Sequence, residues 1–502
     1  MKSVDIRIVS FAAIAAVTGC ANLPSVGPDY KSPEDYAASS VLPDAGLPTE
    51  DLTETYEYKP ASSNEDVRVE ISNEYLARWW ERLNDPILAS LVENAISNNV
   101  DFLIAQRRLE QSLWQMVGTT SAFMPRFSLD GSATRNELHR NNRSVQGAYR
   151  HKEMDVFNGG LNATWEIDVF GGSRRSTEAA IARAQAAVAD VDQAWVTLTT
   201  QIGEKYISLR TTQERIAVAR TNLVLQTETY DILKSRLDSG IGDELAVHQC
   251  AYVVETTRAK IPLLLAEEES LKNAIAILAG EMPGSFSDLL QPDLRRDWLM
   301  APNRVAELPL DMIRSRPDVK SAERRLAAQI ANVGVAKSQW YPRLFINGGV
   351  GMEATHASKF AQPGSFYASI GPSVSWPFFQ GGNVYASVKE AEAAVEEARL
   401  NYERTLDNAH AEVRNAYFSY TQEYHRYKAL QAAVKAATEA VSISKDLYKN
   451  GLKDFNNVLD AQRSRLELEE QLAVSRGQIT TDLIKLYGTL GGGLATGSVD
   501  AE

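Results

Sequence analysis

Apolar side chains recur at helical spacing through two very long stretches of the chain. In the first they alternate at three- and four-residue steps through residues 181–209, and a seven-residue repeat then continues to Leu237. The second stretch begins at residues 384–420 with the same spacing. Each stretch lacks proline over about 65 to 70 residues, which at ~1.5 Å per residue predicts a helix of about 100 Å. We therefore predict two long coiled-coil helices that end at the turns containing Gly240 and Gly451.

Segments with period-two alternation precede both long helices. Residues 161–169 place Leu, Ala, Trp, Ile and Val on one face and Asn, Thr, Glu and Asp on the other, and residues 366–376 repeat this pattern. Weaker partner strands are predicted at 127–133 and 344–350, with polar loops between partners. Strands that are apolar on one face and polar on the other are typical of a barrel wall between lipid and water. A half-buried soluble sheet has the same alternation and stays open as the alternative.

The chain contains an internal repeat. Residues 101–125 align without a gap with residues 318–342, and both segments carry Arg-Arg-Leu in the middle and end in proline. Each half predicts the order helix, strand pair, long helix, turn, helix. We divide the chain into a signal peptide (1–19), a lipidated N-terminal strap (20–75), a first repeat (76–300), a second repeat (301–493) and a C-terminal tail (494–502).

The first twenty residues predict an exported lipoprotein. Lys2 and Arg7 precede an apolar run at 8–17, which is too short to span a bilayer and is followed by small residues and Cys20. We expect cleavage before Cys20 and a covalent lipid on this new N-terminal cysteine, with no other cofactor. Ala21 after the cysteine favours transfer to the outer membrane. An ordinary signal peptide with an incidental cysteine is the alternative.

Composition argues against several other classes of protein. The net charge of -13 argues against nucleic acid as a partner. No mature segment holds about eighteen consecutive apolar residues, so a helical membrane span is not expected. Cys250, the second of two cysteines, is expected to be a small buried residue rather than a nucleophile. Motifs for metal-dependent proteolysis, nucleophilic hydrolysis and phosphate binding are absent, so we predict neither enzymatic activity nor a metal.

Four strands in one chain are too few to close a barrel, because closed barrels need roughly eight or more strands. Two chains would supply about eight strands and an interior filled by side chains, whereas three would supply about twelve and leave a passage. We therefore predict an α+β membrane protein. Its trimeric 12-stranded β-barrel, with four strands from each chain, would continue into a long α-helical coiled-coil periplasmic tunnel. An enzyme and a purely structural coiled-coil envelope protein are the alternatives, and neither would conduct ions in a planar bilayer.

Several motifs together resemble the outer-membrane factor family of TolC-like channels, in particular its lipidated OprM/NodT-like branch. They are GPDYKSP after Cys20, WEIDVFGG, RSRPDVKSAERRLAAQIANVGVAKSQWYPRL, FFQGG, LDAQRSRLELEE and LYGTLGGG. The resemblance covers nearly the whole mature chain. It implies an outer-membrane exit duct that passively conducts small toxic compounds or drugs, with the cargo unassigned. It also implies an equatorial collar, docking to a periplasmic adaptor (a membrane fusion protein) and a proton-driven inner-membrane pump, and a periplasmic tip that opens by untwisting.

Two residues are predicted to form a gate. The resemblance places the LDAQR motif at the narrow periplasmic mouth, where Asp460 and Arg463 share a helix face because three residues separate them. Three copies around one axis would bring these charges together, so we expect them to hold the closed state. A solvated surface pair worth ~0 to 1 kcal/mol is the alternative.

The two turns after the long helices are predicted to face the adaptor. Gly240 and Gly451 provide backbone freedom there, and Asp243 and Asp454 are positioned to cap the returning helices. Turn chemistry without any docking role explains the same residues equally well.

Overall fold

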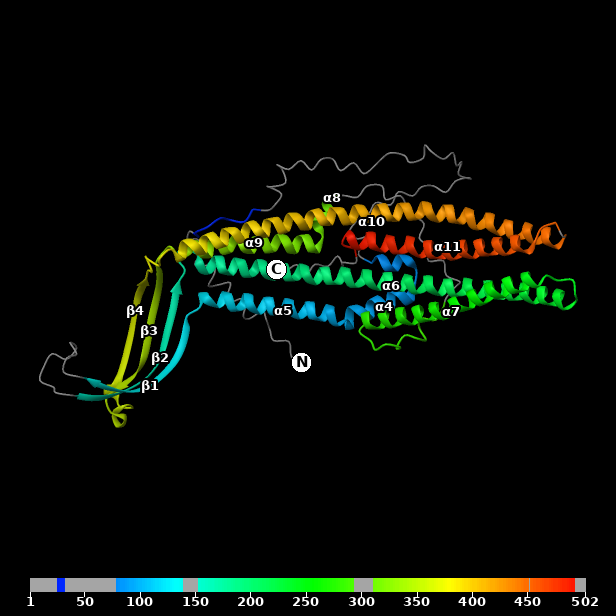
Figure 1. Cartoon of the computed structure of the whole chain (residues 1–502). Helices are drawn as coiled ribbons and strands as arrows, with labels where there is room; N and C mark the ends of the chain where they lie inside the picture. Colours follow the sequence, from blue (N-terminus) through cyan, green and yellow to red (C-terminus); the bar gives the residue numbers. More distant parts are fainter. Residues whose placement is uncertain (1–24, 32–77, 139–151, 293–309, 451, 493–502) are drawn as a thin grey trace. The chain divides into compact units, whose positions relative to one another are not determined.

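The computed structural model describes residues 25–31, 78–138, 152–292, 310–450 and 452–492. Both halves of the chain follow the same order of helix, strand pair, long helix, turn and helix (Figure 1). The elements are η1 (Trp79–Leu83), α4 (Pro86–Asn98), α5 (Val100–Thr120), η2 (Ser121–Phe123), β1 (Arg126–Leu138), β2 (Lys152–Ile167), α6 (Gly172–Asp238), α7 (Glu244–Leu278), α8 (Leu310–Ser315), α9 (Pro317–Ser338), β3 (Arg343–Ala354), η3 (Ala357–Lys359), η4 (Pro363–Ser365), β4 (Phe366–Ser375), α10 (Asn383–Lys449) and α11 (Phe455–Thr489).

The two long helices are confirmed. α6 and α10 contain 67 residues each, about 100 Å at ~1.5 Å per residue. Part of the predicted seam of α6 is not buried, because Ile181 and Val188 are exposed within one chain. The buried positions around them are alanines: Ala179, Ala180, Ala182, Ala184, Ala186 and Ala189. Small side chains let helix backbones approach closely, so this part of α6 packs through alanine rather than through its larger apolar residues.

The strands form one antiparallel sheet in the order β1-β2-β3-β4. β1 pairs with β2 and β3 with β4 within each half, whereas the central pair β2–β3 joins the two halves. The strands extend farther toward their connecting loops than the alternation predicted, since β1 reaches Leu138 and β3 reaches Ala354.

The prediction was wrong at the other ends of two strands. β2 stops at Ile167 and β4 at Ser375, so Val169 and Trp376 lie beyond the sheet. The next residue after β2, Asp168, is buried and accepts a hydrogen bond of 2.8 Å from the backbone N–H in the first turn of α6. Because this carboxylate holds the start of the helix, the chain leaves the strand two residues earlier than alternation alone suggests.

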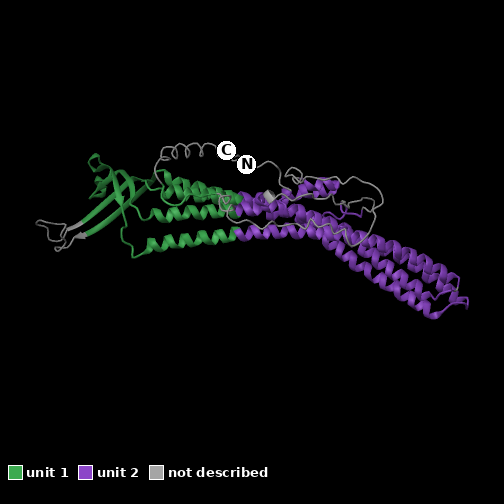
Figure 2. Cartoon of the chain, turned by 90° about the horizontal axis from the view of Figure 1, so that it is seen from above, with its two compact units in different colours: residues 1–45, 109–187, 322–402 green, residues 46–108, 188–321, 403–502 purple. Residues whose placement is uncertain are grey.

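The chain divides into two compact units, coloured separately in Figure 2. Unit 1 comprises residues 1–45, 109–187 and 322–402 and contains the sheet. Unit 2 comprises residues 46–108, 188–321 and 403–502 and contains the turns that follow the long helices. Each unit takes residues from both halves, so the units do not coincide with the sequence repeats. Among the described residues, none of the helices combines the length and the apolar character that crossing a bilayer requires.

Candidate functional site

The sheet of unit 1 has one apolar face. Residues that pair across neighbouring strands project to the same side, and Leu161 pairs with Leu129 on β1 and with Val350 on β3. On β4 the same side carries Ile370. The apolar residues on this side are Phe127, Leu129, Ala133, Phe157, Leu161, Ala163, Trp165, Ile167, Leu344, Ile346, Val350, Met352, Ala354, Phe366, Ala368, Ile370, Pro372 and Val374. Leu129 and Ile370 are 83% and 84% exposed, so this face is largely open in a single chain.

The opposite face of the sheet is mostly polar and internally hydrogen-bonded, with Met154, Val156 and Phe345 among its apolar members. The Asn162 side chain donates to the Asp130 carboxylate at 2.8 Å, and Asn347 donates to the Ser373 hydroxyl at 2.7 Å. Arg343 forms an ion pair with Glu166 on this face. The predicted assignment of apolar and polar residues to opposite faces is therefore confirmed for the strand residues themselves.

Aromatic residues surround the helix-proximal end of the apolar face. The indole N–H of Trp165 donates to the Phe123 carbonyl at 2.9 Å, and that of Trp376 donates to the Trp340 carbonyl at 3.2 Å. We call this set the aromatic rim: Phe123, Trp165, Phe170, Trp340, Tyr341, Trp376, Phe378 and Phe379. Aromatic residues with a hydrogen-bonded polar tip are typical of the boundary between lipid and water. The strand alternation included Trp165 and Trp376 but not the rest of this rim, because seven of its eight residues lie outside the strands.

The apolar face has a second boundary, at the end of the strands β1 and β2 that is close to their connecting loop. Arg135 and Asp155 project to the same side as Leu129 and form a two-point ion pair, with distances of 2.8 and 3.1 Å. A charge pair at this position bounds the apolar band at its second edge. The face therefore has the composition of a band with polar or aromatic borders at both ends.

In unit 2, the hairpins α6–α7 and α10–α11 pack against each other near their turns. Their shared apolar cluster is Leu233, Ala246, Val247, Cys250, Val253, Phe455, Val458 and Leu459, with Tyr230, Leu237 and Tyr448 beside it. Cys250 is a buried member of this cluster, and burial raises the pKa of its thiol to about 11, which disfavours the nucleophilic thiolate. The predicted role of Cys250 as a small packing residue is confirmed.

The two turns have matching backbone hydrogen bonds but different caps. The Ile241 N–H donates to the Arg236 carbonyl at 3.1 Å, and the Leu452 N–H donates to the Leu447 carbonyl at 2.9 Å. Gly240 has a φ of +74°, a conformation that favours glycine. The corresponding Gly451 lies outside the described residues. Both turns leave an apolar side chain, Ile241 and Leu452, exposed.

Only one of the two predicted aspartate caps forms. Asp243 accepts a hydrogen bond from the Leu245 N–H at 3.0 Å, whereas the Asp454 side chain makes no cap at the start of α11. That prediction was wrong for Asp454, whose backbone carbonyl instead accepts from the Asn457 side chain at 3.2 Å. We expect Asp243→Ala to cost about 1 kcal/mol of stability and Asp454→Ala to cost close to zero. Chemical denaturation of the two variants measures the difference, and equal losses would contradict it.

Asp460 and Arg463 lie on one face of α11. Their closest N–O distance is 3.9 Å, and their side chains are 76% and 46% exposed in one chain. The Arg463 guanidinium also lies 5.6 Å from the centre of the Tyr252 ring on α7. Such a long, exposed pair contributes little within one chain, so both charges are available to groups outside it.

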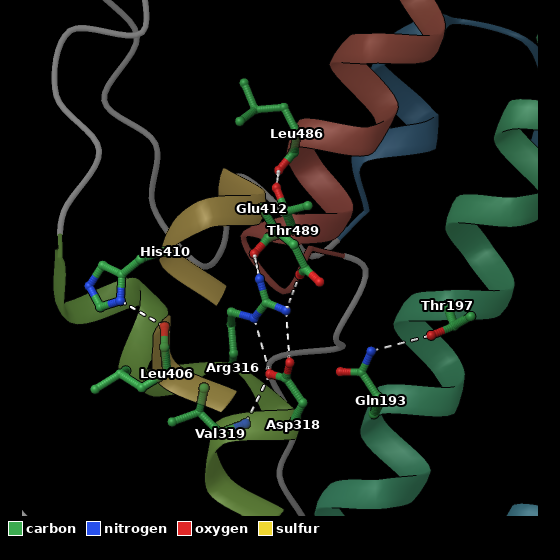
Figure 3. Close-up of polar contacts among 10 residues, drawn as sticks. All are labelled: Gln193, Thr197, Arg316, Asp318, Val319, Leu406, His410, Glu412, Leu486 and Thr489. Carbon is green, nitrogen blue, oxygen red and sulfur yellow. Dashed lines mark hydrogen bonds and ion pairs between the residues drawn. The ribbon is translucent and has the colours of Figure 1, made fainter. Parts of the chain in front are cut away.

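Within unit 2, Arg316 contacts the parts of α9, α10 and α11 that belong to this unit (Figure 3). Its guanidinium binds both carboxylate oxygens of Asp318 at 3.0 and 2.8 Å, Glu412 of α10 at 2.7 Å and the Thr489 carbonyl of α11 at 2.8 Å. The side chain is only 7% exposed. We call this group the Arg316 junction. Arg316 lies in the RSRPD motif, but pattern analysis assigned it no role because Glu412 and Thr489 lie 96 and 173 residues away in the sequence.

The first repeat has a smaller counterpart of the Arg316 junction. Extending the gap-free alignment by two residues toward the N-terminus pairs Asn99 with Arg316. Asn99 donates to the Leu278 carbonyl at 2.9 Å, and Leu278 is the last residue of α7 as Thr489 is the last residue of α11. Both repeats therefore hold the end of their final helix from the equivalent position, and the second repeat adds a charge contact to α10.

Comparison with known proteins identifies the family. A family model described as "Outer membrane efflux protein" matches residues 91–281 and 308–492. The chain belongs to this family. The resemblance to outer-membrane factor channels is thereby confirmed, and the chain is an outer membrane efflux protein, a member of a family of channels rather than of enzymes. Within the described part of this outer membrane efflux protein, no cluster of three or more His, Cys, Asp or Glu side chains is arranged to hold a metal ion.

Relatives of this outer membrane efflux protein match most of its length. Nodulation protein T of Rhizobium leguminosarum bv. trifolii is 29% identical over 489 residues, covering 96% of this chain and 95% of the relative. Outer membrane protein OprJ of Pseudomonas aeruginosa is 27% identical, covering 83% and 86%. A solved structure of the outer-membrane channel OprN is 29% identical, with a TM-score of 0.81, and covers 93% of this chain and 99% of that one. The α+β fold of this chain is therefore that of an outer-membrane channel subunit.

Proposed function

We propose that three copies of this chain form the outer-membrane exit duct of a tripartite efflux pump. The single observation that carries the proposal is the two-faced sheet, with an apolar face bounded at both ends and a polar face on the other side. β1 and β4 are the edge strands of this sheet. An exposed edge offers unpaired backbone groups to another strand, so β4 of one copy would pair with β1 of the next. Twelve strands would then enclose a water-filled passage lined by the polar face.

The duct is tested by measuring single-channel conductance of the purified, detergent-solubilised full-length protein in planar bilayers, together with its mass by light scattering. We expect a trimer and stepwise conductance. A monomer without conductance would overturn the proposal, as neither a soluble sheet nor a structural coiled-coil protein opens a pore. Passage through such a duct is passive, so it requires no catalytic group and no cofactor.

The N-terminal residues would anchor the duct in the membrane. Cys20 lies outside the described residues, and we propose that it carries the lipid after removal of residues 1–19. The strap at 20–75 would then lead into the first repeat at 76–300, with the second repeat and tail following. Mass spectrometry of the mature amino terminus tests this assignment, since an unmodified Cys20 would contradict it.

Asp460 and Arg463 would act as the gate. Within one chain they are exposed and weakly paired, whereas three copies around an axis would bring six such charges together. We expect Asp460→Ala and Arg463→Ala to increase the resting conductance severalfold, because removing one partner leaves the other unpaired at the closed mouth. Single-channel recording and uptake of a large antibiotic by whole cells measure the leak.

A matched pair provides the control for the gate. Glu255 and Arg258 on α7 are also three residues apart, ion-paired and exposed. We expect Glu255→Ala and Arg258→Ala to leave the resting conductance unchanged. Leakage that is equal in both sets of variants, or absent from both, would remove Asp460 and Arg463 from the gate.

The turns after α6 and α10 would contact the periplasmic adaptor of a proton-driven inner-membrane pump. Their exposed Ile241 and Leu452 side chains provide apolar contacts beside Gly240, Asp243, Gly451 and Asp454. A photo-crosslinking residue at Ile241 or Leu452 is expected to form an adduct with a co-expressed adaptor. The same residue at exposed Leu263 on α7 serves as the control. Equal adduct from all three positions would contradict docking through the turns.

A further inference from the structure

Three of the sequence motifs meet at one place in unit 1. They are residues 25–31, which include GPDYK of the first motif and are drawn in blue in Figure 1, the VFGG link between β2 and α6, and the ANVG segment of α9. The Val26 N–H donates to the Phe170 carbonyl at 3.2 Å. A Cβ added to Gly27 would lie 2.5 Å from the Gly334 Cα, and one added to Gly334 would lie 2.9 Å from the Val26 carbonyl oxygen. The N-terminal backbone therefore lies directly against the α9 backbone, which only glycine permits.

Side chains fix the same segment to both helices. Arg175 of α6 is buried and pairs with Asp29 and with Glu178. The Tyr30 hydroxyl donates to Glu323 of α9 at 2.6 Å. The Tyr30 ring packs against a small apolar cluster formed by Ala182, Ala327 and Ala328. Residues 25–31 thus contact α6 and α9 simultaneously.

The contacts of residues 25–31 with α6 and α9 lie next to the central strand pair, β2 and β3. α6 follows β2 and α9 precedes β3, so the segment lies where both helices connect to the strands. The links themselves are in contact, because Phe170 and Tyr341 stack with their ring centres 4.7 Å apart. Gly172 approaches Ser338 as closely, since an added Cβ would lie 2.6 Å from its hydroxyl oxygen.

The central pair is also the pairing with the greatest loop-closure cost. β1–β2 and β3–β4 are local hairpins, but β2–β3 joins Ile167 to Leu344 and Phe157 to Ala354, close to two hundred residues apart. The entropy lost on closing a loop grows with its length, so a non-local pair gains most from an additional contact that holds its ends together.

We infer that residues 25–31 form an N-terminal clasp that must be seated between α6 and α9 for β2 and β3 to stay paired. The N-terminus is then an assembly element of the sheet, separate from any lipid attached at Cys20. The inference goes beyond the exit-duct function and does not depend on conductance.

Gly334→Ala tests the clasp, with Gly118→Ala as the matched control. Both glycines lie in helices of unit 1, where alanine ordinarily stabilises, and an added Cβ meets nothing within 4 Å at Gly118. Hydrogen exchange is measured on the full-length protein in detergent. We expect peptides from β2, β3 and residues 25–31 to exchange roughly tenfold faster in Gly334→Ala, and peptides from α7 and α11 to be unchanged. Gly118→Ala should match the natural protein, and equal exchange in both variants would overturn the clasp.

Two milder variants keep the inference testable if Gly334→Ala fails to accumulate. Tyr30→Phe removes only the hydrogen bond to Glu323 and is expected to accelerate exchange roughly threefold in the same peptides. Cys20→Ser removes the acylation site and leaves residues 25–31 unchanged, so its β2 and β3 peptides should exchange at the natural rate. Acceleration by Cys20→Ser with no effect of Tyr30→Phe would assign the result to the lipid and overturn the clasp.

Discussion

Replacing Leu161 by arginine is expected to prevent assembly of this protein in the outer membrane. Leu161 lies at the middle of the apolar face, between Leu129 and Val350 on the neighbouring strands. An arginine on the lipid side of a barrel costs ~2 to 4 kcal/mol at the bilayer midplane, and a trimer would carry three. The assembled trimer is measured in outer-membrane fractions as a detergent-resistant band whose gel mobility changes on heating. We expect the amount of this trimer to fall below detection.

The opposite face of the same strand provides the control. Thr164 lies on β2 among the polar positions, paired with Asn347 on β3. Thr164→Arg places the same charge in the proposed passage, where water solvates it, so the trimer should assemble and its ion selectivity should shift toward anions. Normal assembly of Leu161→Arg would mean that the apolar face does not contact lipid.

Replacing Arg316 by glutamine is expected to lower the stability of the protein by about 2 kcal/mol. The guanidinium is almost fully buried, and its removal leaves Asp318, Glu412 and the Thr489 carbonyl without their shared cation. Breaking a fully buried pair costs ~3 to 5 kcal/mol. The expected loss is smaller because Glu412 is 54% exposed and regains water. Thermal unfolding followed by circular dichroism at fixed detergent concentration measures the loss.

Two further substitutions separate the parts of the Arg316 junction. Glu412→Gln removes one half-exposed partner and should cost less than ~1 kcal/mol. Arg316→Lys keeps the charge but loses the planar fork that binds both oxygens of Asp318, so its loss should lie between the other two. If Arg316→Gln and Glu412→Gln were equally mild, the junction would be a surface ion pair rather than a point that joins α9, α10 and α11.

Local pattern was sufficient for the elements with a clear period. The seven-residue spacing predicted α6 and α10 and the turns that end them, and alternation predicted which residues share each face of the sheet. It was wrong where a single tertiary contact decides the outcome. Asp168 ends β2 early because its carboxylate binds the start of α6. Within one chain, alanines rather than Ile181 make the contacts of that part of α6.

For the candidate functional residues as well, sequence spacing predicted some features correctly and others wrongly. Asp460 and Arg463 were predicted to share a helix face, and three-residue spacing places them there whatever the surroundings. Asp243 and Asp454 occupy equivalent positions in the two repeats, yet only Asp243 caps its helix. Equivalent sequence therefore did not ensure equivalent hydrogen bonding, since a cap depends on the side-chain rotamer and backbone angles of each turn.

Periodicity, the internal repeat and the motifs by themselves determined the order of elements, the two faces of the sheet and the family. The order of elements and the two faces of the sheet depend on residues close in sequence, whose geometry is set by helix and strand repeats. The tertiary structure alone revealed the Arg316 junction, the arrangement of the aromatic rim and the position of residues 25–31 between α6 and α9. Each joins segments far apart in the chain. The spacing of apolar residues along the sequence does not indicate which distant residue a buried arginine or a close-packed glycine contacts.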